Sequence, residues 1–356
     1  MASIRRRRAQ LSEADDTPAP SPASGGWRRA LRITRRYVLP VLGWAWAVGG
    51  AALAVSLILG LALHPVLLAL QGMQFLVLAP CWLVLGSAAL RRRRVQGALA
   101  VIAVLVHLWF SVPAAVSAAA PSWTVGAPRV SLFVANVRYR NPDPKTVARR
   151  IVAADADVVV VLEVTPRLRA AFDEAGLTAT YRWRSMTPDD GRFGDMVMSR
   201  LPARDVGLVR AGPIVVPSLT VDVGGRLVRV HAVHAPNPSP VSRLDRWRSG
   251  LAALRRLAER DGGAVVFAGD FNASGFHRAY RSMLGGGLSD AHDERGLGLT
   301  PSWGPESNPL PWPDALIRLD HAAYSGSIYP VALQNGEMPG SDHRPFAVTF
   351  AVRPRR

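Results

Sequence analysis

The chain has 356 residues, 49% of them hydrophobic, and a net charge of +17. Its mean hydropathy is slightly positive, which is unusual for a wholly soluble protein and favours membrane-spanning segments beside a globular domain. Cys81 is the only cysteine, which excludes an intrachain disulfide and a cysteine-based zinc site.

Residues 1–36 are rich in Arg, Ser, Pro, Ala and Gly and contain few apolar residues. This composition predicts a disordered basic tail. The run Arg5–Arg8 fits a targeting signal or a nucleic-acid patch, but the simpler interpretation is a cytoplasmic flank that binds anionic lipid headgroups. Residues 1–129 hold 14 arginines against three acidic residues, so most of the basic excess lies in this part of the chain.

Three uncharged runs follow, at 37–63, 66–90 and 95–120, and each reaches the roughly 20 residues that a spanning helix needs. Arginines cluster before the first run, and Arg91–Arg94 separate the second run from the third. The positive-inside rule places both clusters in the cytoplasm. We therefore predict a multi-pass plasma-membrane protein with three transmembrane helices, a cytoplasmic N-terminus and an extracellular domain after residue 120.

From residue 129 to 353, short apolar runs with β-branched residues alternate with turn residues. Asp143-Pro144 predicts the start of a helix that continues to about Ala154, and the apolar spacing in Ser242–Arg260 predicts an amphipathic helix. Such a series favours an α/β domain with two packed sheets and outer helices. The expected strands are Val130–Ala135, Asp157–Leu162, Asp195–Ser199, Ser218–Val223, Leu227–His234, Ala264–Ala268, Leu319–Tyr324 and Phe346–Val352.

Polar and acidic residues recur at the ends of these strands, where residues distant in sequence can meet at one rim. Each has a structural alternative, such as a solvated strand end or an Asx turn. Together they suit phosphate-ester hydrolysis, because carboxylates hold a hard cation and a carboxylate or histidine moves protons. The set comprises Asn136, Glu163, His234, Asp270, Asn272, Asp320, Asp342 and His343.

The order and context of these residues resemble the motifs of the endonuclease/exonuclease/phosphatase superfamily, which includes DNase I-like nucleases, sphingomyelinases and inositol-phosphate phosphatases. The match covers residues 130–352, and Gly269–Ala273 and Ser341–Pro345 are its most specific parts. The resemblance implies a four-layered, DNase I-like α/β sandwich. It also implies Mg²⁺ at one rim, with Mn²⁺ as the alternative.

The same resemblance implies roles for the metal-binding residues. Glu163 is expected to be the principal metal ligand, with Asn136 beside it and Asp342 binding or orienting the metal. Asp270 is expected to orient or deprotonate the attacking water, and Asn272 to donate to the phosphoryl oxygens.

Two histidines complete the expected catalytic set. Asp320 and His343 are expected to form a carboxylate–imidazole pair, with the histidine contacting the phosphoryl group. His234 is expected to be the second catalytic histidine, although we place His231 on the same face as a competitor. Many relatives carry Asn where this chain has Asp195. Its carboxylate either binds metal, repels a second phosphate or caps a turn, and the sequence leaves these interpretations open.

The overall plan also resembles three-span membrane phosphatases related to teicoplanin/vancomycin-resistance proteins, which are associated with undecaprenyl diphosphate in the cell envelope. We therefore expect an enzyme that hydrolyses a lipid-linked phosphate or diphosphate, with the bilayer and this lipid as partners. The domain's modest positive charge makes nucleic acid a less favoured partner, and no protein partner is predicted. The alternatives are an extracellular membrane-tethered nuclease and a catalytically inactive sensor or binding module.

Overall fold

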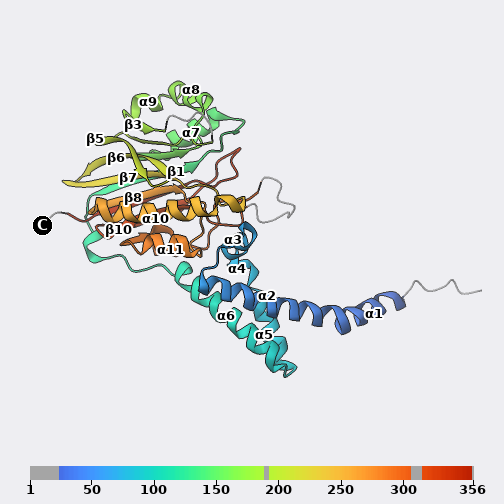
Figure 1. Cartoon of the computed structure of the whole chain (residues 1–356). Coiled ribbons are helices and arrows are strands. Elements are labelled where there is room, and N and C mark those ends of the chain that lie inside the picture. The colour runs from blue at the N-terminus through green and yellow to red at the C-terminus, as the bar shows by residue number, and fades with distance from the viewer. Residues whose placement is uncertain (1–23, 188–191, 306–314, 355–356) are drawn as a thin grey trace, which may run out of the picture.

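The computed structural model describes residues 24–187, 192–305 and 315–354, so the first 23 residues of the expected tail lie outside the described part. The chain forms a group of apolar N-terminal helices and a larger α/β domain (Figure 1). The end of the expected disordered tail is helical, because α1 (Ser24–Ile33) and the π-helical η1 (Thr34–Val38) run directly into α2 (Leu39–Leu59). An adjoining helix supplies the nucleus that an isolated segment would have to form for itself.

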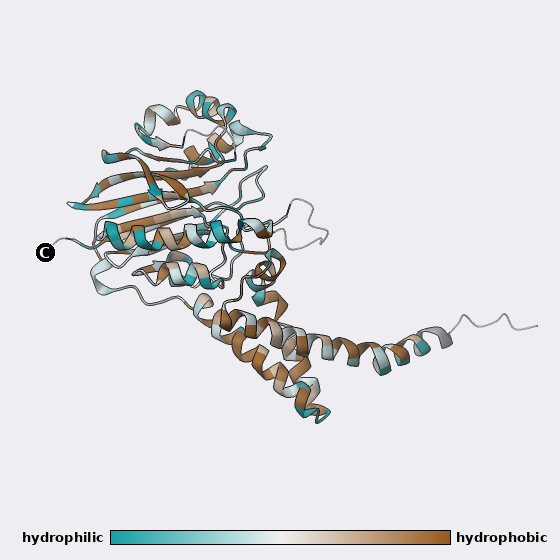
Figure 2. Ribbon diagram, in the orientation of Figure 1, coloured by the Kyte–Doolittle hydropathy of each residue, from teal (hydrophilic) through white to brown (hydrophobic). Residues whose placement is uncertain are grey.

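Two helices are long and apolar enough to cross a membrane, namely Arg29–Leu59 and Arg94–Ala115, the second of which is α6. A third candidate consists of α3 (Pro65–Gly72) and the segment Gln74–Leu90, which contains α4 (Gln74–Val77) and α5 (Cys81–Leu90). The two parts of this candidate meet at an angle of 74°, so the second apolar run is a broken span or a re-entrant segment. Figure 2 shows the apolar colouring of these helices.

Small residues and buried amides join the apolar helices, as is common inside membranes. A Cβ at Gly50 of α2 would lie 2.5 Å from the sulfur of Cys81, so the helices approach closely there. Gln74 donates to Ser111 at 3.1 Å, and this bond links α4 to α6. One turn further along α6, the backbone N–H of Gly298 donates to the carbonyl of Ala114 at 2.9 Å, which fastens this helix to the α/β domain.

The α/β domain contains two six-stranded sheets, each with one central parallel pair and otherwise antiparallel neighbours. The first sheet has the order β11 (Ile328–Asn335), β12 (Phe346–Val352), β1 (Arg129–Asn136), β2 (Val158–Leu162), β4 (Met196–Ser199), β3 (Trp183–Met186). The second has the order β5 (Ala203–Ala211), β6 (Ile214–Val223), β7 (Arg226–His234), β8 (Ala264–Asp270), β10 (Asp320–Ser325), β9 (Leu288–Asp290).

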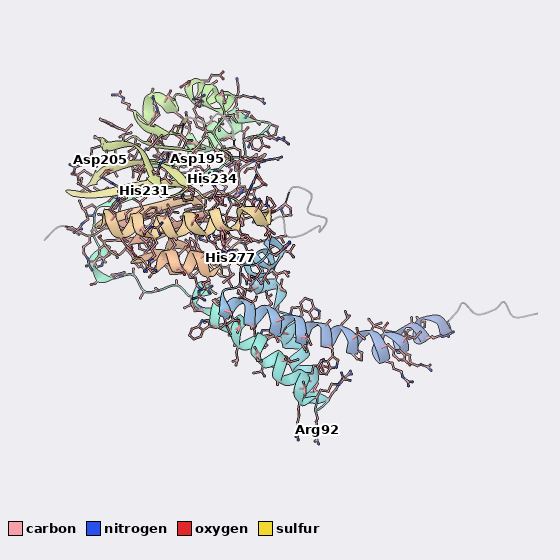
Figure 3. The ribbon with its side chains drawn as sticks, viewed as in Figure 1. Arg92, Asp195, Asp205, His231, His234 and His277 are labelled. Atoms are coloured by element: carbon pink, nitrogen blue, oxygen red, sulfur yellow. The ribbon has the colours of Figure 1, made fainter. Side chains whose placement is uncertain are left out.

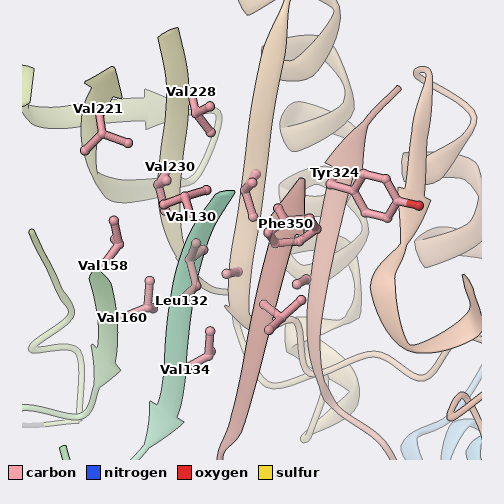
Figure 4. Close-up of a cluster of buried hydrophobic side chains, with 14 of the residues drawn as sticks. Val130, Leu132, Val134, Val158, Val160, Val221, Val228, Val230, Tyr324 and Phe350 are labelled. Carbon is pink, nitrogen blue, oxygen red and sulfur yellow. The ribbon is translucent and has the colours of Figure 1, made fainter. Parts of the chain in front are cut away.

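The inner faces of the two sheets pack against each other and form the central core (Figure 4). Valines dominate it because alternate residues of a strand point to the same face, as Val228 and Val230 do in β7. Helices α7 (Pro144–Ala154), α8 (Pro166–Glu174) and α9 (Leu177–Thr180) cover the first sheet, and α10 (Leu244–Asp261) and α11 (Arg278–Leu284) cover the second. These layers confirm the expected α/β sandwich. Three short helices, η2 (Ser122–Thr124), η3 (Val241–Arg243) and α12 (Ala291–Glu294), lie in connections.

Candidate active site

The strand directions bring the candidate residues to one edge of the sandwich. β7 and β8 are parallel and end at His234 and Asp270, which are directly paired in register. β10 runs antiparallel to β8 and begins at Asp320, whose register partner is Asp270. Gly269 has a φ of +139°, and a Cβ there would lie 2.1 Å from the carbonyl oxygen of Val233. Only glycine therefore allows β7 and β8 to approach closely beside the site.

The first sheet contributes an amide and a carboxylate. Asn136, at the end of β1, places its Nδ2 3.3 Å from Asp270 Oδ2 and 3.4 Å from Glu163 Oε1. Glu163 follows β2 with a φ of +64°, an uncommon backbone conformation for a residue with a side chain. Its other oxygen accepts a hydrogen bond from the backbone N–H of Tyr139 at 2.8 Å. Oxygens from both sheets therefore converge on one amide.

Two carboxylate–imidazole pairs lie on either side of Asp270. Asp320 Oδ2 lies 2.8 Å from His343 Nδ1, and Asp195 Oδ1 lies 3.0 Å from His234 Nδ1. The free Nε2 atoms of His343 and His234 face Asp270 Oδ2 at 3.7 Å and 4.0 Å. Asp195 is thus the carboxylate partner of His234, an arrangement that none of the sequence-based interpretations included. Figure 3 shows Asp195 and His234 side by side.

Charge within this buried group shifts the pKa values. Burial alone would lower the pKa of His343, but Asp320 and Asp270 raise it to about 10. Burial likewise opposes the charge of His234, while Asp195, and then Asp270 and Glu163, raise its pKa to about 9. Burial raises the pKa of Asp270 to about 6, against the lowering effect of the two histidines. At neutral pH, two imidazolium donors therefore flank one carboxylate that readily accepts a proton.

Hydroxyl groups hold this arrangement in place, and the sequence did not predict the parts played by Ser302 and Thr187. Ser302 Oγ donates to Asp320 Oδ2 at 2.7 Å and accepts from the backbone N–H groups of Leu319 and Asp320. Thr187 Oγ1 accepts from the backbone N–H of Asp195 at 2.8 Å. Ser341 Oγ donates to the carbonyl of Asn136 at 2.8 Å. No local pattern marks Ser302 or Thr187, since each acts on a residue of another segment.

Asn272 has a left-handed backbone conformation, with a φ of +46°, and its side chain lies against the site. Its backbone N–H donates to Asp270 Oδ1 at 2.8 Å, which forms the Asx turn weighed from the sequence. Its side-chain amide donates to the carbonyl of Ala235 at 2.9 Å and lies 3.4 Å from Asp270 Oδ2. Asn272 therefore lies beside Asp270.

One expected position differs from the structure, and another has a partner that the sequence did not predict. His231 does not share a face with His234, because the two residues are three apart in a strand and so point to opposite sides. It is buried against α10, where its Nε2 lies 2.8 Å from Asp261. Asp342 Oδ2 accepts from the indole N–H of Trp303 at 3.1 Å, and its charge helps to raise the pKa of the adjacent His343, so its expected metal role stays a prediction.

A divalent cation fits the chemistry of this edge. Ligand atoms of Asp270, Asp320 and His343 lie within 4.8 Å of one another. Asp320 Oδ1 is buried and has no hydrogen-bond partner among the described residues, so it is available to a cation. Glu163 and Asp270 supply further oxygens around Asn136, and hard cations prefer oxygen ligands.

The fold and the site together define a two-sheet α/β domain with a buried carboxylate–imidazole cluster at one edge. The model of the Endonuclease/Exonuclease/phosphatase family matches residues 133–343, which is more than half of the chain. The chain belongs to this family. A comparison with curated proteins found no match.

Solved structures are similar to this chain at low sequence identity. A truncated TDP2 from Caenorhabditis elegans is 17% identical with a TM-score of 0.51, over 63% of this chain and 98% of that one. Sphingomyelinase C from Streptomyces griseocarneus is 18% identical with a TM-score of 0.46, over 62% and 99% of the two chains. An endonuclease/exonuclease/phosphatase from Beutenbergia cavernae is 20% identical with a TM-score of 0.48, over 63% and 72%.

Proposed function

We propose that the chain is a membrane-anchored, extracytoplasmic, Mg²⁺-dependent phosphoesterase that hydrolyses a lipid-linked phosphate or diphosphate, with undecaprenyl diphosphate as the leading candidate. The observation that carries this proposal is the contact between the bent apolar segment and the active-site loops. At the end of α3, a Cβ on Gly72 would lie 3.0 Å from Ile317 and 3.5 Å from Ser274.

Both contacted residues belong to segments that build the site. Ser274 comes two residues after Asn272, and Ile317 pairs with Trp303, which in turn pairs with His343. The bent segment also exposes apolar side chains, among them Val66, Phe75 and Leu76. A phosphate carried on a lipid would therefore meet the active-site edge where the apolar helices adjoin it. Tethering beside the bilayer also raises the effective concentration of such a substrate.

The helix ends favour an extracytoplasmic catalytic domain. The C-terminal ends of α2 and α6 both meet the α/β domain, through Leu59 with Arg278 and through Ala114 with Gly298. The run Arg91–Arg94, between α5 and α6, lies at the opposite end of the helices, where Figure 3 labels Arg92. Since arginine clusters favour the cytoplasmic side, the domain belongs on the other side of the membrane.

The residues suggest a division of roles in hydrolysis. Asp270 accepts the proton of the attacking water, because its raised pKa makes it a competent base near neutral pH. His343 and His234 each hold a proton on Nε2 that faces the site, where it stabilises charge on a phosphoryl oxygen or moves to the leaving oxygen. Glu163 and Asn136 would hold the cation, which offsets the negative charge of the phosphoryl group.

Phosphate release by the full-length protein in detergent with Mg²⁺ tests this proposal. The panel contains undecaprenyl diphosphate, sphingomyelin, inositol phosphates and DNA, and Asp270→Asn is the inactive control. We expect release from the lipid diphosphate that disappears in the variant. Plasmid nicking that depends on Asp270, without lipid hydrolysis, would establish the nuclease instead. Full cellular function in the Asp270→Asn strain would favour a binding module.

A further inference from the structure

We propose a second ligand site, in which a cavity between the end of α2 and helices α10 and α11 binds the phosphate of an anionic phospholipid. The cavity has a volume of about 310 Å³, at the lower end of the roughly 300–1,000 Å³ typical of small-ligand pockets. Its lining includes Leu68, Trp247, Met283 and three arginines, and none of its lining residues belongs to the carboxylate–imidazole cluster. The inference depends on the proposed membrane location but not on the proposed reaction.

The cavity carries positive charge that its surroundings only partly neutralise. Arg248 and Arg255 line it from α10, and Arg278 lines it from the start of α11. Among the described residues, none of those lining the cavity is acidic. Arg248 and Arg255 have carboxylate partners on their own helix, at Asp245 and Glu259. Guanidinium groups that line the same cavity favour the binding of an anion between them.

Arg278 differs from the other two arginines because its hydrogen-bond partner in the described part of the chain is a backbone carbonyl. Its Nη1 donates to Leu59 at 3.0 Å, and no carboxylate in the described part of the chain lies within ion-pair distance of it. The neighbouring His277 adds no charge, since burial lowers its pKa to about 4. Its ring nitrogens bond the Ser274 N–H and the Leu68 carbonyl, which fixes the neutral ring in the lining of the cavity. Figure 3 labels His277 between the α/β domain and the apolar helices. A guanidinium with no counter-ion among the described residues therefore borders a cavity that is lined on one side by a fixed, neutral imidazole.

The position of the cavity favours a lipid over a free anion. It begins where α2 ends, at Gly60, and a Cβ there would lie 2.0 Å from Cδ of Arg278. The side chains of Ile58, Leu59 and Leu63 beside this point are 54% to 66% exposed. A phospholipid satisfies both features, because its phosphate pairs with arginine while its acyl chains cover the apolar side chains. Inorganic phosphate would leave the apolar part uncovered.

A bound lipid would fix the α/β domain on the bilayer at the point where α2 leaves it. Arg248 also donates to the carbonyl of Ala62, so the same arginines hold the connection after α2. The structural alternative is that these arginines only cap the carbonyls at the C-terminal end of α2. Capping predicts a loss of stability on mutation but no lipid selectivity, and an experiment can therefore separate the two roles.

The test uses full-length protein in a non-ionic detergent and counts bound lipid by native mass spectrometry. The probes are phosphatidylglycerol, phosphatidylcholine and inorganic phosphate. We expect phosphatidylglycerol to bind about tenfold more tightly than either other probe. Phosphatidylcholine carries a choline cation that offsets its phosphate charge, and inorganic phosphate has no acyl chains to cover the apolar side chains. Arg278→Gln and Arg255→Gln are expected to weaken its binding by about tenfold. Arg256→Gln is the matched control, because it removes the same charge from an exposed position on α10 outside the cavity.

Three results would overturn the proposal. One is unchanged phosphatidylglycerol affinity in both cavity variants, and another is an equal effect of the Arg256→Gln control. The third is equal binding of all three probes. Arg255→Gln keeps the test valid if Arg278→Gln fails to fold, since Arg255 is exposed and does not cap α2. Catalysis is not measured, so a failure of the proposed hydrolysis leaves this result interpretable.

Discussion

The substitution Asp195→Asn tests whether His234 acts as an imidazolium. Asp195 is the foremost of three acids that together raise the pKa of His234 from 6.5 to about 9. This rise corresponds to about 3 kcal/mol in favour of the protonated ring. Removing the adjacent charge should lower the pKa by about one to two units, as is usual for a close opposite charge.

The direction of the effect follows from the raised pKa. In the native protein, His234 is protonated at neutral pH and loses its proton as the pH rises through about 9. The stabilisation that this charge gives the fold is likewise present below pH 6.5 and lost through the same range. In the variant, His234 should lose its proton, and the fold this stabilisation, near pH 7 to 8. At pH 8 the protonated fraction of His234 should therefore fall from about nine-tenths in the native protein to about a quarter in the variant.

The assay is the pH dependence of kcat/KM for a chromogenic phosphodiester with full-length protein and Mg²⁺. We expect the alkaline limb to move down by about one to two pH units in Asp195→Asn. The control is Asp205→Asn, which removes a half-exposed carboxylate paired with Arg229 and should change stability by less than about 1 kcal/mol. An alkaline limb that stays in place in a folded Asp195→Asn protein would refute the assigned role of His234.

Three further outcomes are expected. Asp270→Asn should lower the rate of hydrolysis by on the order of 10³-fold. It should also raise the melting temperature at pH 8 in EDTA, because burial raises the pKa of this carboxyl to about 6 and its ionised form destabilises the fold above that pH. A lower melting temperature in the variant would contradict this. Gly269→Ala should lower the free energy of unfolding, measured in urea, by more than about 3 kcal/mol, since the added Cβ would overlap the Val233 carbonyl. A decrease of less than about 1 kcal/mol would contradict the close approach of the strands. Removal of divalent cations with EDTA should abolish activity. Mg²⁺ at a hundredfold excess over its Kd should raise the free energy of unfolding by about 2.7 kcal/mol. An unchanged melting temperature on adding Mg²⁺ would argue against the cation site.

Local patterns in the sequence predicted much of the domain. All eight expected strands are present, and α7 begins at Pro144 with Asp143 accepting from Thr146 at 3.0 Å. The missed strands β3, β5, β9 and β11 are short or carry exposed polar residues. β5, for example, alternates weakly and places arginines and Asp205 at the surface. Pairing with a neighbour, rather than its own hydrophobic pattern, makes such a segment a strand.

The sequence by itself determined the apolar runs, the strand-end carboxylates and their family resemblance, because hydrophobic periodicity and short motifs are local properties. Tertiary structure alone decided that Asp195 pairs with His234, 39 residues away in the other sheet, and that Ser302 supports Asp320. It also decided that the second apolar run bends by 74° and that α3 lies against the active-site loops. These contacts depend on which strands are neighbours and how the sheets and helices pack, and no short stretch of sequence records that information.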